Sequence, residues 1–455
     1  MPDHFEPLYT AAEMRAAEER YPGYPDSVPE LMQRAGRAVA REAMQAFPAA
    51  RRFACVCGGG SNGGDGRIAA QALREAGHAV DETVEVEGYD VIVDALFGTG
   101  FSGEPRPEAA ALIERMNAAD APVVSVDLPS GVDASTGELA GAAVNADLTV
   151  TFHASKVGLA VAPGRFHAGR VVVADIGLEE MSTEHRRATT ALLARVPRRG
   201  SRDTKYTAGS VLVVGGRPGM TGAACLTALA ALRADAGYVT LAVPARSLPV
   251  VESLALEPVK IGWREDRAFE TVAAAAERAG AVAIGPGLGR TPARRRLVRE
   301  VLERIDLPAV VDADALFGLG RVERTAPTIL TPHAGELARL LDTDAAWIGA
   351  HRLEAAQQGA ERFSAVVLLK GTDTIVAASG AGSIVCDLGP PSLATAGTGD
   401  VLTGIVAAFL SKGLEPQLAG AAAAVAHAIA ASLVPHRTGL VAGDLLASLP
   451  AALDA

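Results

Sequence analysis

Apolar runs alternate with helical stretches rich in Ala, Leu and Arg along the whole chain. In the first half, the apolar runs predict strands at 53–57, 91–95, 122–127, 148–152 and 170–174. Helical patterns at 67–76 and 107–119 separate the earlier runs. Because continuously apolar strands separated by helices are typical of a sheet covered on both faces, the first half is predicted to be a parallel α/β domain.

The same alternation restarts after a polar, basic segment at 182–209, which contains Pro197 and Gly200 and is predicted to be a linker. Further strands are predicted at 210–214, 238–243, 281–284, 308–311, 328–330 and 365–369. A chain of 455 residues also exceeds the usual size of a single core. We therefore expect two domains, spanning residues 1–198 and 199–455.

Composition narrows the class of protein. A net charge of −11 argues against a nucleic-acid-binding protein, although local amide groups could still hold a small anion. The longest apolar stretch, 420–434, is too short to span a membrane and contains His427, so it is predicted to be a buried helix. The N-terminus has no signal-peptide pattern, and the four cysteines form no CxxC pair. We expect a cytoplasmic protein with reduced thiols.

Unusual residues follow several strands of the first half, at the sheet edge where α/β proteins gather ligands. The segments are GGGSNGGDG after 53–57, DALFGTGFSGE at 94–104, DLPSGVD at 127–133 and TFHASKVG at 151–158. Glycine amides followed by a helix start favour a phosphate-bearing ligand. The spacing matches neither a dinucleotide-binding GxGxxG loop nor a GxxxxGK[ST] loop.

Three oxygen-bearing side chains in these segments, Asn62, Asp94 and Ser130, could converge. Oxygen ligands without Cys or His suit an alkali or alkaline-earth cation rather than zinc.

A second glycine-rich element, ATAGTGDVLTG at 394–404, lies near the end of the chain. Gly397, Thr398 and Gly399 open a predicted helix that has Asp400 in its first turn. Amides at such a helix start can neutralise a phosphoryl group in transfer, while the carboxylate accepts a proton from the attacking hydroxyl. The alternative role for Asp400 is to cap the helix. The upstream segments TPHAGE and LLKGTDT favour the catalytic reading.

With these motifs together, the chain resembles a known family. GGGSNGGDG, DALFGTG, DLPSGVD and TFHASKVG resemble the NAD(P)H-hydrate epimerases, whereas GMTGAA, GPGLGR, TPHAGE, LLKGTDT and AGTGDVLTG resemble the ADP-dependent NAD(P)H-hydrate dehydratases. In this order, they resemble bacterial bifunctional NAD(P)H-hydrate repair enzymes. The resemblance implies a Rossmann-like parallel-sheet domain followed by a ribokinase-like α/β domain.

For the epimerase half, the resemblance implies a substrate site, a potassium ion held by Asn62, Asp94 and Ser130, and proton transfer by Lys156 and Asp127. The implied substrate-binding residues are Ser61, Asn62, Gly63, Gly64, Asp65, Gly98, Thr99, Gly100, Phe101, Ser102, Gly103, Glu104 and Asp127.

For the dehydratase half, the resemblance implies hydrate binding by Ala223, Gly287, His333 and Asp400, with Asp400 as the base. ADP is the implied co-substrate, with Mg²⁺ as its candidate companion. The implied ADP-binding residues are Lys370, Gly371, Thr372, Asp373, Thr374, Gly397, Thr398 and Gly399. The expected partners are the hydrates of NADH and NADPH and ADP, with no nucleic acid and no membrane.

The chain departs from the family pattern at Ser61, where a second asparagine is common, and at Ala234 and Asp235, where a small pair ending in glycine is typical. Two alternatives stay open. One is a ribokinase-like small-molecule kinase, and the other is an N-terminal module that binds nucleotide without catalysis. The sequence does not choose between a monomer and a homo-oligomer, or between NADH and NADPH hydrates.

Overall fold

The computed structural model describes residues 4–321, 323–436 and 438–454. Among these, no helix is long and apolar enough to cross a membrane. The predicted buried helix is confirmed as α14 (Pro416–Ser432), in which His427 is buried. All four cysteines are free thiols, and all but the half-buried Cys57 are buried.

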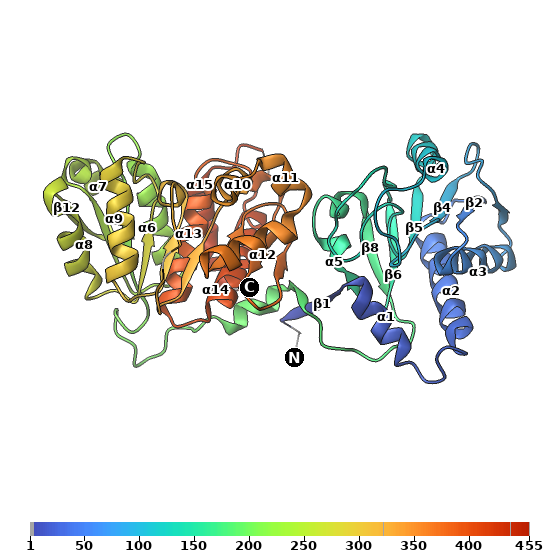
Figure 1. Ribbon diagram of the computed structural model, residues 1–455. Coiled ribbons are helices and arrows are strands. Elements are labelled where there is room, and N and C mark those ends of the chain that lie inside the picture. Colours follow the sequence, from blue (N-terminus) through green and yellow to red (C-terminus); the bar gives the residue numbers. More distant parts are fainter. Residues whose placement is uncertain (1–3, 322, 437, 455) are drawn as a thin grey trace. The chain divides into compact units, whose positions relative to one another are not determined.

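Apart from two short segments, the chain divides into one compact unit over residues 7–185 and another that begins at residue 186 (Figure 1). The predicted linker contains strand β9 (His185–Ala188) and the 3-10 helix η2 (Thr190–Arg195), so much of it is regular structure. The functional boundary between residues 198 and 199 stays a prediction.

The N-terminal unit contains a parallel sheet in the order β3-β2-β4-β5-β6-β8. Its strands are β2 (Arg52–Cys57), β3 (Ala79–Glu82), β4 (Val91–Ala95), β5 (Val123–Val126), β6 (Leu148–Phe152) and β8 (Arg170–Ala174). Outside this six-stranded sheet, β1 (Phe5–Tyr9) pairs in parallel with β7 (Ser155–Lys156).

Helices cover both faces of this sheet because its strands are apolar on both sides. Val91 and Val93 of β4 pack into a cluster with helices on one face, whereas the intervening Ile92 packs with Ile113 and Met116 on the other. The helices of the unit are α1 (Ala11–Glu19), α2 (Val28–Ala46), α3 (Ser61–Glu75), α4 (Pro107–Ala118), the short α5 (Val157–Ala160) and η1 (Gly164–His167).

The C-terminal unit contains a mixed sheet in the order β12-β11-β10-β13-β14-β15-β16-β17-β18-β9. Its pairs are parallel except β16 with β17 and β17 with β18. The strands are β10 (Ser210–Val214), β11 (Tyr238–Pro244), β12 (Val259–Trp263), β13 (Ala281–Ile284), β14 (Ala309–Val311), β15 (Thr328–Leu330), β16 (Val366–Leu369), β17 (Thr374–Ala377) and β18 (Ile384–Cys386).

Small residues let the helices of this unit pack closely. A Cβ atom on Gly404 of α13 would lie 2.2 Å from the carbonyl oxygen of Thr227 on α6. The helices are α6 (Thr221–Arg233), α7 (Leu248–Leu254), α8 (Ala268–Ala276), α9 (Pro292–Arg304), α10 (Ala334–Leu341), α11 (Ala345–Ala350), α12 (Arg352–Phe363), α13 (Thr398–Ser411), α14 and α15 (Ala442–Asp454). Short 3-10 turns are η3 (Ala245–Ser247), η4 (Glu265–Arg267), η5 (Ala313–Leu316) and η6 (Pro391–Leu393).

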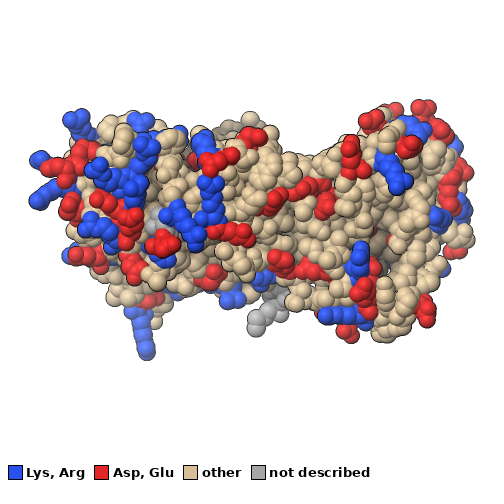
Figure 2. Space-filling model, in the orientation of Figure 1, with Lys and Arg blue, Asp and Glu red and all other residues tan. Residues whose placement is uncertain are grey.

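The surface does not carry one sign of charge despite the net charge of −11. Figure 2 shows Lys and Arg side chains intermingled with Asp and Glu over the part of the visible face that carries α8 and α9. The sequence PARRRLVREVLER of α9 supplies both signs on one helix.

Candidate functional site

The glycines between β2 and α3 have two roles. Some allow close packing of the backbone, and others line a cavity. A Cβ atom on Gly58 would lie 2.2 Å from the carbonyl oxygen of Leu96, and one on Gly63 would lie 1.9 Å from the carbonyl oxygen of Gly58. A side chain at either position would displace backbone. In contrast, Gly59 and Gly60 have open space at their Cβ positions and line a cavity.

That cavity, of about 480 Å³, lies where the loops after several N-terminal strands meet. The predicted substrate-binding residues that line it are Ser61, Asn62, Asp65, Gly98, Thr99, Gly100, Phe101 and Asp127. Within the described residues, the predicted positions outside its lining are Gly63, Gly64, Ser102, Gly103 and Glu104. The start of α3 and the inner part of the loop after β4 therefore form one concave surface.

The three predicted cation ligands lie close together around the carbonyl group of Phe97. The Asn62 carboxamide donates to Phe97 O at 2.8 Å, and the Ser130 hydroxyl accepts from Phe97 N at 2.9 Å. The same hydroxyl donates to Asp94 Oδ1 at 2.6 Å. Burial raises the pKa of Asp94, which is opposed by hydrogen bonds from Ser130 and Ser125. Asn62, Asp94, Ser130 and the carbonyl of Phe97 each offer an oxygen atom, which is the donor type that a hard cation takes, and the cation site itself stays a prediction.

Asp127 and Lys156, the predicted proton-transfer pair, are in direct contact. Lys156 Nζ lies 2.9 Å from Asp127 Oδ1 and donates to the Thr151 hydroxyl and to Phe152 O, each at 2.8 Å. Burial opposes ionisation of Asp127, but Lys156 and the hydrogen bonds from Thr151 and Thr99 lower its pKa. Asp127 lines the cavity, whereas Lys156 is fully buried behind it.

Asp65 is a second carboxyl group that lines the cavity, and its pKa is shifted in the opposite direction from that of Asp127. Burial, followed by the charges of Asp127 and Glu18, raises the pKa of Asp65 to about 8. Asp65 is therefore mostly protonated at neutral pH beside an ionised Asp127, a division typical of acid–base pairs.

Glu18 is a cavity residue that the sequence analysis did not select. It lies near the end of α1, a helix that begins with a capping box between Thr10 and Glu13. Met14, Arg15 and Glu18 of this helix line the cavity. Burial and the charge of Asp127 raise the pKa of Glu18. The sequence signal was the helical spacing of these residues, but it does not say against which surface the helix packs.

In the C-terminal unit, α13 begins as the sequence predicted. Gly397, with φ of 92°, is the N-cap, and Thr398, Gly399 and Asp400 form the first turn. Burial, followed by the charge of Asp312, raises the pKa of Asp400 to about 7, against the opposing charge of Lys370. A carboxylate with this pKa is suited to accept a proton near neutral pH.

Lys370 is the member of the predicted ADP segment that reaches the start of α13. Its Nζ atom lies 2.8 Å from Asp312 Oδ1 and 3.4 Å from the Cβ position of Gly399. Burial opposes its charge, but Asp312, Glu336 and Asp400 raise its pKa. Asp312 lies in the segment VVDADAL at 310–316, directly after β14, and was not among the predicted site residues.

The predicted hydrate-binding residues occupy different elements. Ala223 O and Asp400 O both accept from the Thr227 hydroxyl at 3.0 Å, which places α6 against the start of α13. Gly287 is buried with φ of 60°. His333 is the exposed N-cap of α10, where its Nδ1 accepts from Gly335 N. Ala223 and Asp400 are thus linked through the hydroxyl group of Thr227.

Most of the predicted ADP segment lies in the loop between β16 and β17. The Thr374 hydroxyl donates to Gly371 O at 3.1 Å, and Thr372 is exposed. Asp373 is buried, and its carboxylate lies 2.8 Å from Arg352 Nε on α12. The side chain of Asp373 therefore anchors the loop.

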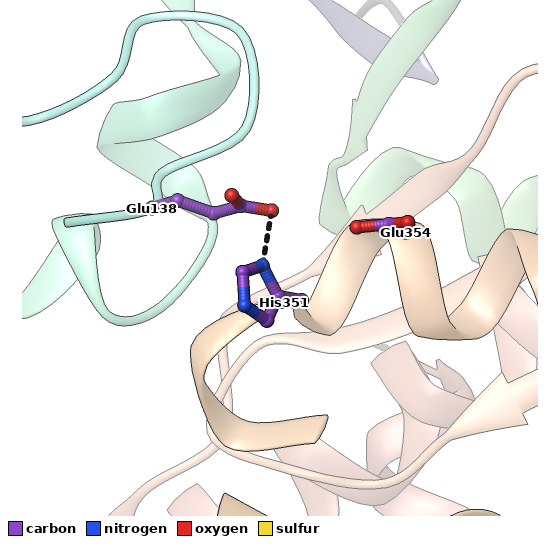
Figure 3. A group of neighbouring side chains, drawn as sticks. All are labelled: Glu138, His351 and Glu354. Carbon is purple, nitrogen blue, oxygen red and sulfur yellow. Dashed lines mark ion pairs between the residues drawn. The ribbon is translucent and has the colours of Figure 1, made fainter. Parts of the chain in front are cut away.

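Figure 3 shows His351 just ahead of α12 and Glu354 on the first turn of that helix.

Asp235, which stands where the family pattern typically has glycine, forms two ion pairs. Asp235 adopts φ of 68°, and its carboxylate lies 2.6 Å from Lys412 Nζ and 3.0 Å from Arg199. These contacts give Asp235 a structural role at the end of α13, on the opposite end from Asp400.

Comparison with known proteins extends this picture. The family model described as NAD(P)H-hydrate dehydratase matches residues 211–451, and that described as YjeF-related protein N-terminus matches residues 28–87 and 79–158. A solved ribokinase-like superfamily protein from Enterococcus faecalis, 23% identical, covers 61% of this chain and 98% of its own with a TM-score of 0.52. The ribokinase-like fold of the C-terminal unit is thereby confirmed.

Two relatives carry more specific descriptions. The crystal structure of the ADP/ATP-dependent NAD(P)H-hydrate dehydratase from Bacillus subtilis, co-crystallised with ATP and Mg²⁺, is 30% identical, covers 58% of this chain and 96% of its own, and has a TM-score of 0.53. The bifunctional NAD(P)H-hydrate repair enzyme of Moorella thermoacetica is 39% identical over 510 residues, covering 97% of this chain and 96% of that protein. The chain therefore belongs to the family of bifunctional NAD(P)H-hydrate repair enzymes.

Proposed function

We propose that this chain repairs hydrated NADH and NADPH with two separate sites. The N-terminal cavity interconverts the R and S epimers of the hydrate, and the C-terminal site uses ADP to dehydrate the S epimer to NAD(P)H, releasing AMP and phosphate. The observation that carries the proposal is the presence of an acid–base carboxyl pair in one unit and a carboxylate at a glycine-rich helix start in the other. The family membership supports both assignments.

For dehydration, Asp400 accepts the proton of the hydrate's hydroxyl as its oxygen attacks the β-phosphoryl group of ADP. The bond between that phosphorus and the bridging oxygen breaks, and AMP leaves. The amides at 397–399 and the ammonium of Lys370 stabilise the negative charge on the phosphoryl oxygens. Phosphate then leaves the carbon, and loss of a proton from the neighbouring carbon restores the double bond of the ring.

For epimerisation, Asp65 donates a proton to the hydroxyl on carbon six, and the ring nitrogen's lone pair expels it as water. Water then adds to the opposite face of the ring while Asp127 accepts its proton, and this proton returns to Asp65 through solvent before the next turnover. Lys156 keeps Asp127 ionised from behind, so we assign it to proton transfer through Asp127 rather than by contact with the substrate. The loop carrying Gly98, Thr99 and Phe101 and the start of α3 hold the substrate.

Potassium fits the oxygen atoms of Asn62, Asp94 and Ser130, together with the carbonyl of Phe97. When bound, the ion would supply a positive charge at the cavity wall, beside the phosphate-bearing substrate. In the C-terminal unit, we propose that Mg²⁺ accompanies the nucleotide. We place both reactions in the cytoplasm, whose reducing conditions suit the four free thiols.

The test is recovery of NADH absorbance from a mixture of R and S hydrates by the purified full-length chain. ADP should support complete recovery, because both epimers feed the dehydratase. ATP is tested separately, since the Bacillus subtilis relative is described as dependent on ADP or ATP. Recovery without any nucleotide would contradict the proposed dehydration, and recovery that stops when the S epimer is consumed would contradict the proposed epimerisation.

A further inference from the structure

Asp312 lies at the end of β14 and has both carboxylate oxygens occupied by specific partners. Oδ1 is 2.8 Å from Lys370 Nζ, and Oδ2 accepts from the Thr403 hydroxyl at 2.7 Å. The residue is 1% exposed. A buried carboxylate that makes two such contacts holds its partners in a fixed geometry.

The two partners come from different elements that meet at the predicted phosphoryl site. Lys370 follows β16, and Thr403 lies one helical turn beyond Gly399 in α13. The Thr403 hydroxyl also lies 3.1 Å from Gly399 O, and Lys370 Nζ lies 3.4 Å from the Cβ position of Gly399. Asp312 therefore connects the ammonium group to the first turn of α13.

The backbone of Asp312 is held as firmly as its side chain. Its N–H donates to Ile284 O at 3.1 Å, and its carbonyl oxygen lies 1.8 Å from the position that a Cβ atom on Gly285 would take. Gly285 has φ of 126°, which a residue with a side chain rarely adopts. The carboxylate thus extends from a rigid strand end.

Asp312 also contributes to the electrostatic environment of Asp400. The charged groups that act on Asp400 are Asp312, Lys370, Asp314 and Glu336. Asp314 is paired with Arg290 at 2.7 Å. Burial and the charge of Asp312 are the two largest causes that raise the pKa of Asp400 to about 7.

We propose that Asp312 is a positioning residue for the dehydratase reaction, which holds the ammonium group of Lys370 against the start of α13, and that Thr403 fixes the orientation of its carboxylate. This inference rests on the proposed function of the C-terminal site. Nothing in the geometry requires Asp312 to touch the substrate.

The test compares Asp312→Asn, Thr403→Val and Thr403→Ser in the full chain, with the exposed Asp306→Asn as a matched control. The Asn variant should lower kcat of dehydration about 100-fold, because a misplaced charged group loses its effect on the phosphoryl oxygens. Its pH profile should also shift to lower pH, because a negative neighbour of Asp400 is lost. Thr403→Val should lower kcat of dehydration about tenfold, because one hydrogen bond to a carboxylate is lost. Thr403→Ser keeps the hydroxyl group and should have a kcat close to that of the wild type.

Circular dichroism and thermal unfolding of each variant report on folding of the C-terminal unit, epimerisation shows that the separate N-terminal unit is intact, and Asp306→Asn should behave as the wild type does. A kcat within twofold of wild type with an unchanged pH profile in Asp312→Asn would overturn the inference. Equal losses in Thr403→Val and Thr403→Ser would also overturn it, and this comparison holds if Asp312→Asn fails to fold. Absence of dehydration by the wild type contradicts the proposed function instead, so the two failures are distinct.

Discussion

Asp65, Asp127 and Asp400 are aspartates in the two predicted sites, and their surroundings differ. Asp127 is kept ionised by Lys156, whereas burial and negative neighbours raise the pKa of Asp65 to about 8 and that of Asp400 to about 7. These differences in pKa predict how epimerisation, dehydration and the stability of the fold depend on pH.

The replacement Asp65→Asn should inactivate epimerisation and stabilise the fold. The folded chain retains a proton on Asp65 between about pH 4 and 8, where the unfolded chain has lost it, so stability falls as pH rises through this window. Asn removes that penalty, and at pH 8.5 the free energy of unfolding should rise by about 1–3 kcal/mol. Chemical denaturation and chromatographic separation of the epimers measure both effects.

The control for this replacement is Asp120→Asn, an exposed position in the same unit. It should change neither stability nor epimerisation. If Asp65→Asn left epimer exchange intact and gave no stabilisation, Asp65 would not be the protonated group in the cavity.

The pH dependence of dehydration should follow Asp400. A base acts only when ionised, so kcat should increase about tenfold per unit below pH 7 and level off above it. Epimerisation should instead fall above about pH 8, as Asp65 loses its proton. Rates measured from pH 5.5 to 9 with each pure epimer separate the two profiles. A dehydration rate that declines from pH 6 to 8 would rule out Asp400 as the base.

At the scale of elements, the start of α13 depends on its packing against α6. A methyl group at Gly404 would lie 2.2 Å from Thr227 O, and Thr227 also binds the carbonyl of Asp400. Gly404→Ala should therefore lower the free energy of unfolding by about 1–3 kcal/mol. It should also lower the rate of dehydration, because the first turn of α13 is displaced. Thermal unfolding and a dehydration assay test this.

The matched control is Gly222→Ala, a helical glycine in α6 whose Cβ position is open. It should stay within about 0.5 kcal/mol of wild type. Equal Tm values for the two variants would show that the close crossing of α6 and α13 does not limit stability.

Most of the apolar strands could be predicted from the sequence, and each predicted strand was found within one or two residues of its predicted bounds. Strands β1, β3, β7, β9, β12, β17 and β18 were not predicted. They have two to five residues, and β9 lies in a polar segment that becomes a strand by pairing with distant strands such as β18. Such pairing joins residues far apart in the chain, which local hydrophobic patterns do not report.

The candidate sites could be predicted where they depend on strand ends and glycine loops, as for Asn62, Asp127 and Asp400. The position of Glu18 in the N-terminal cavity could not be predicted, because it depends on the surface against which α1 packs. The burial of Lys156 behind Asp127 and the contact between Asp312 and Lys370 also depend on tertiary approach.

At the scale of the whole molecule, the two sets of residues lie in separate compact units. No residue proposed for one reaction belongs to the unit proposed for the other, within the described chain. The proposed two-step repair therefore predicts that each activity can be removed by itself.

The most direct measurement is the activity of Asp400→Asn on a mixture of R and S hydrates supplied with ADP. With Asp400 as the base of a separate dehydration site, NADH absorbance should no longer recover, while pure R hydrate should still convert to an R and S mixture at the wild-type rate. Dehydration that persists in this variant would contradict Asp400 as the base. Loss of both reactions in a folded protein would contradict two independent sites.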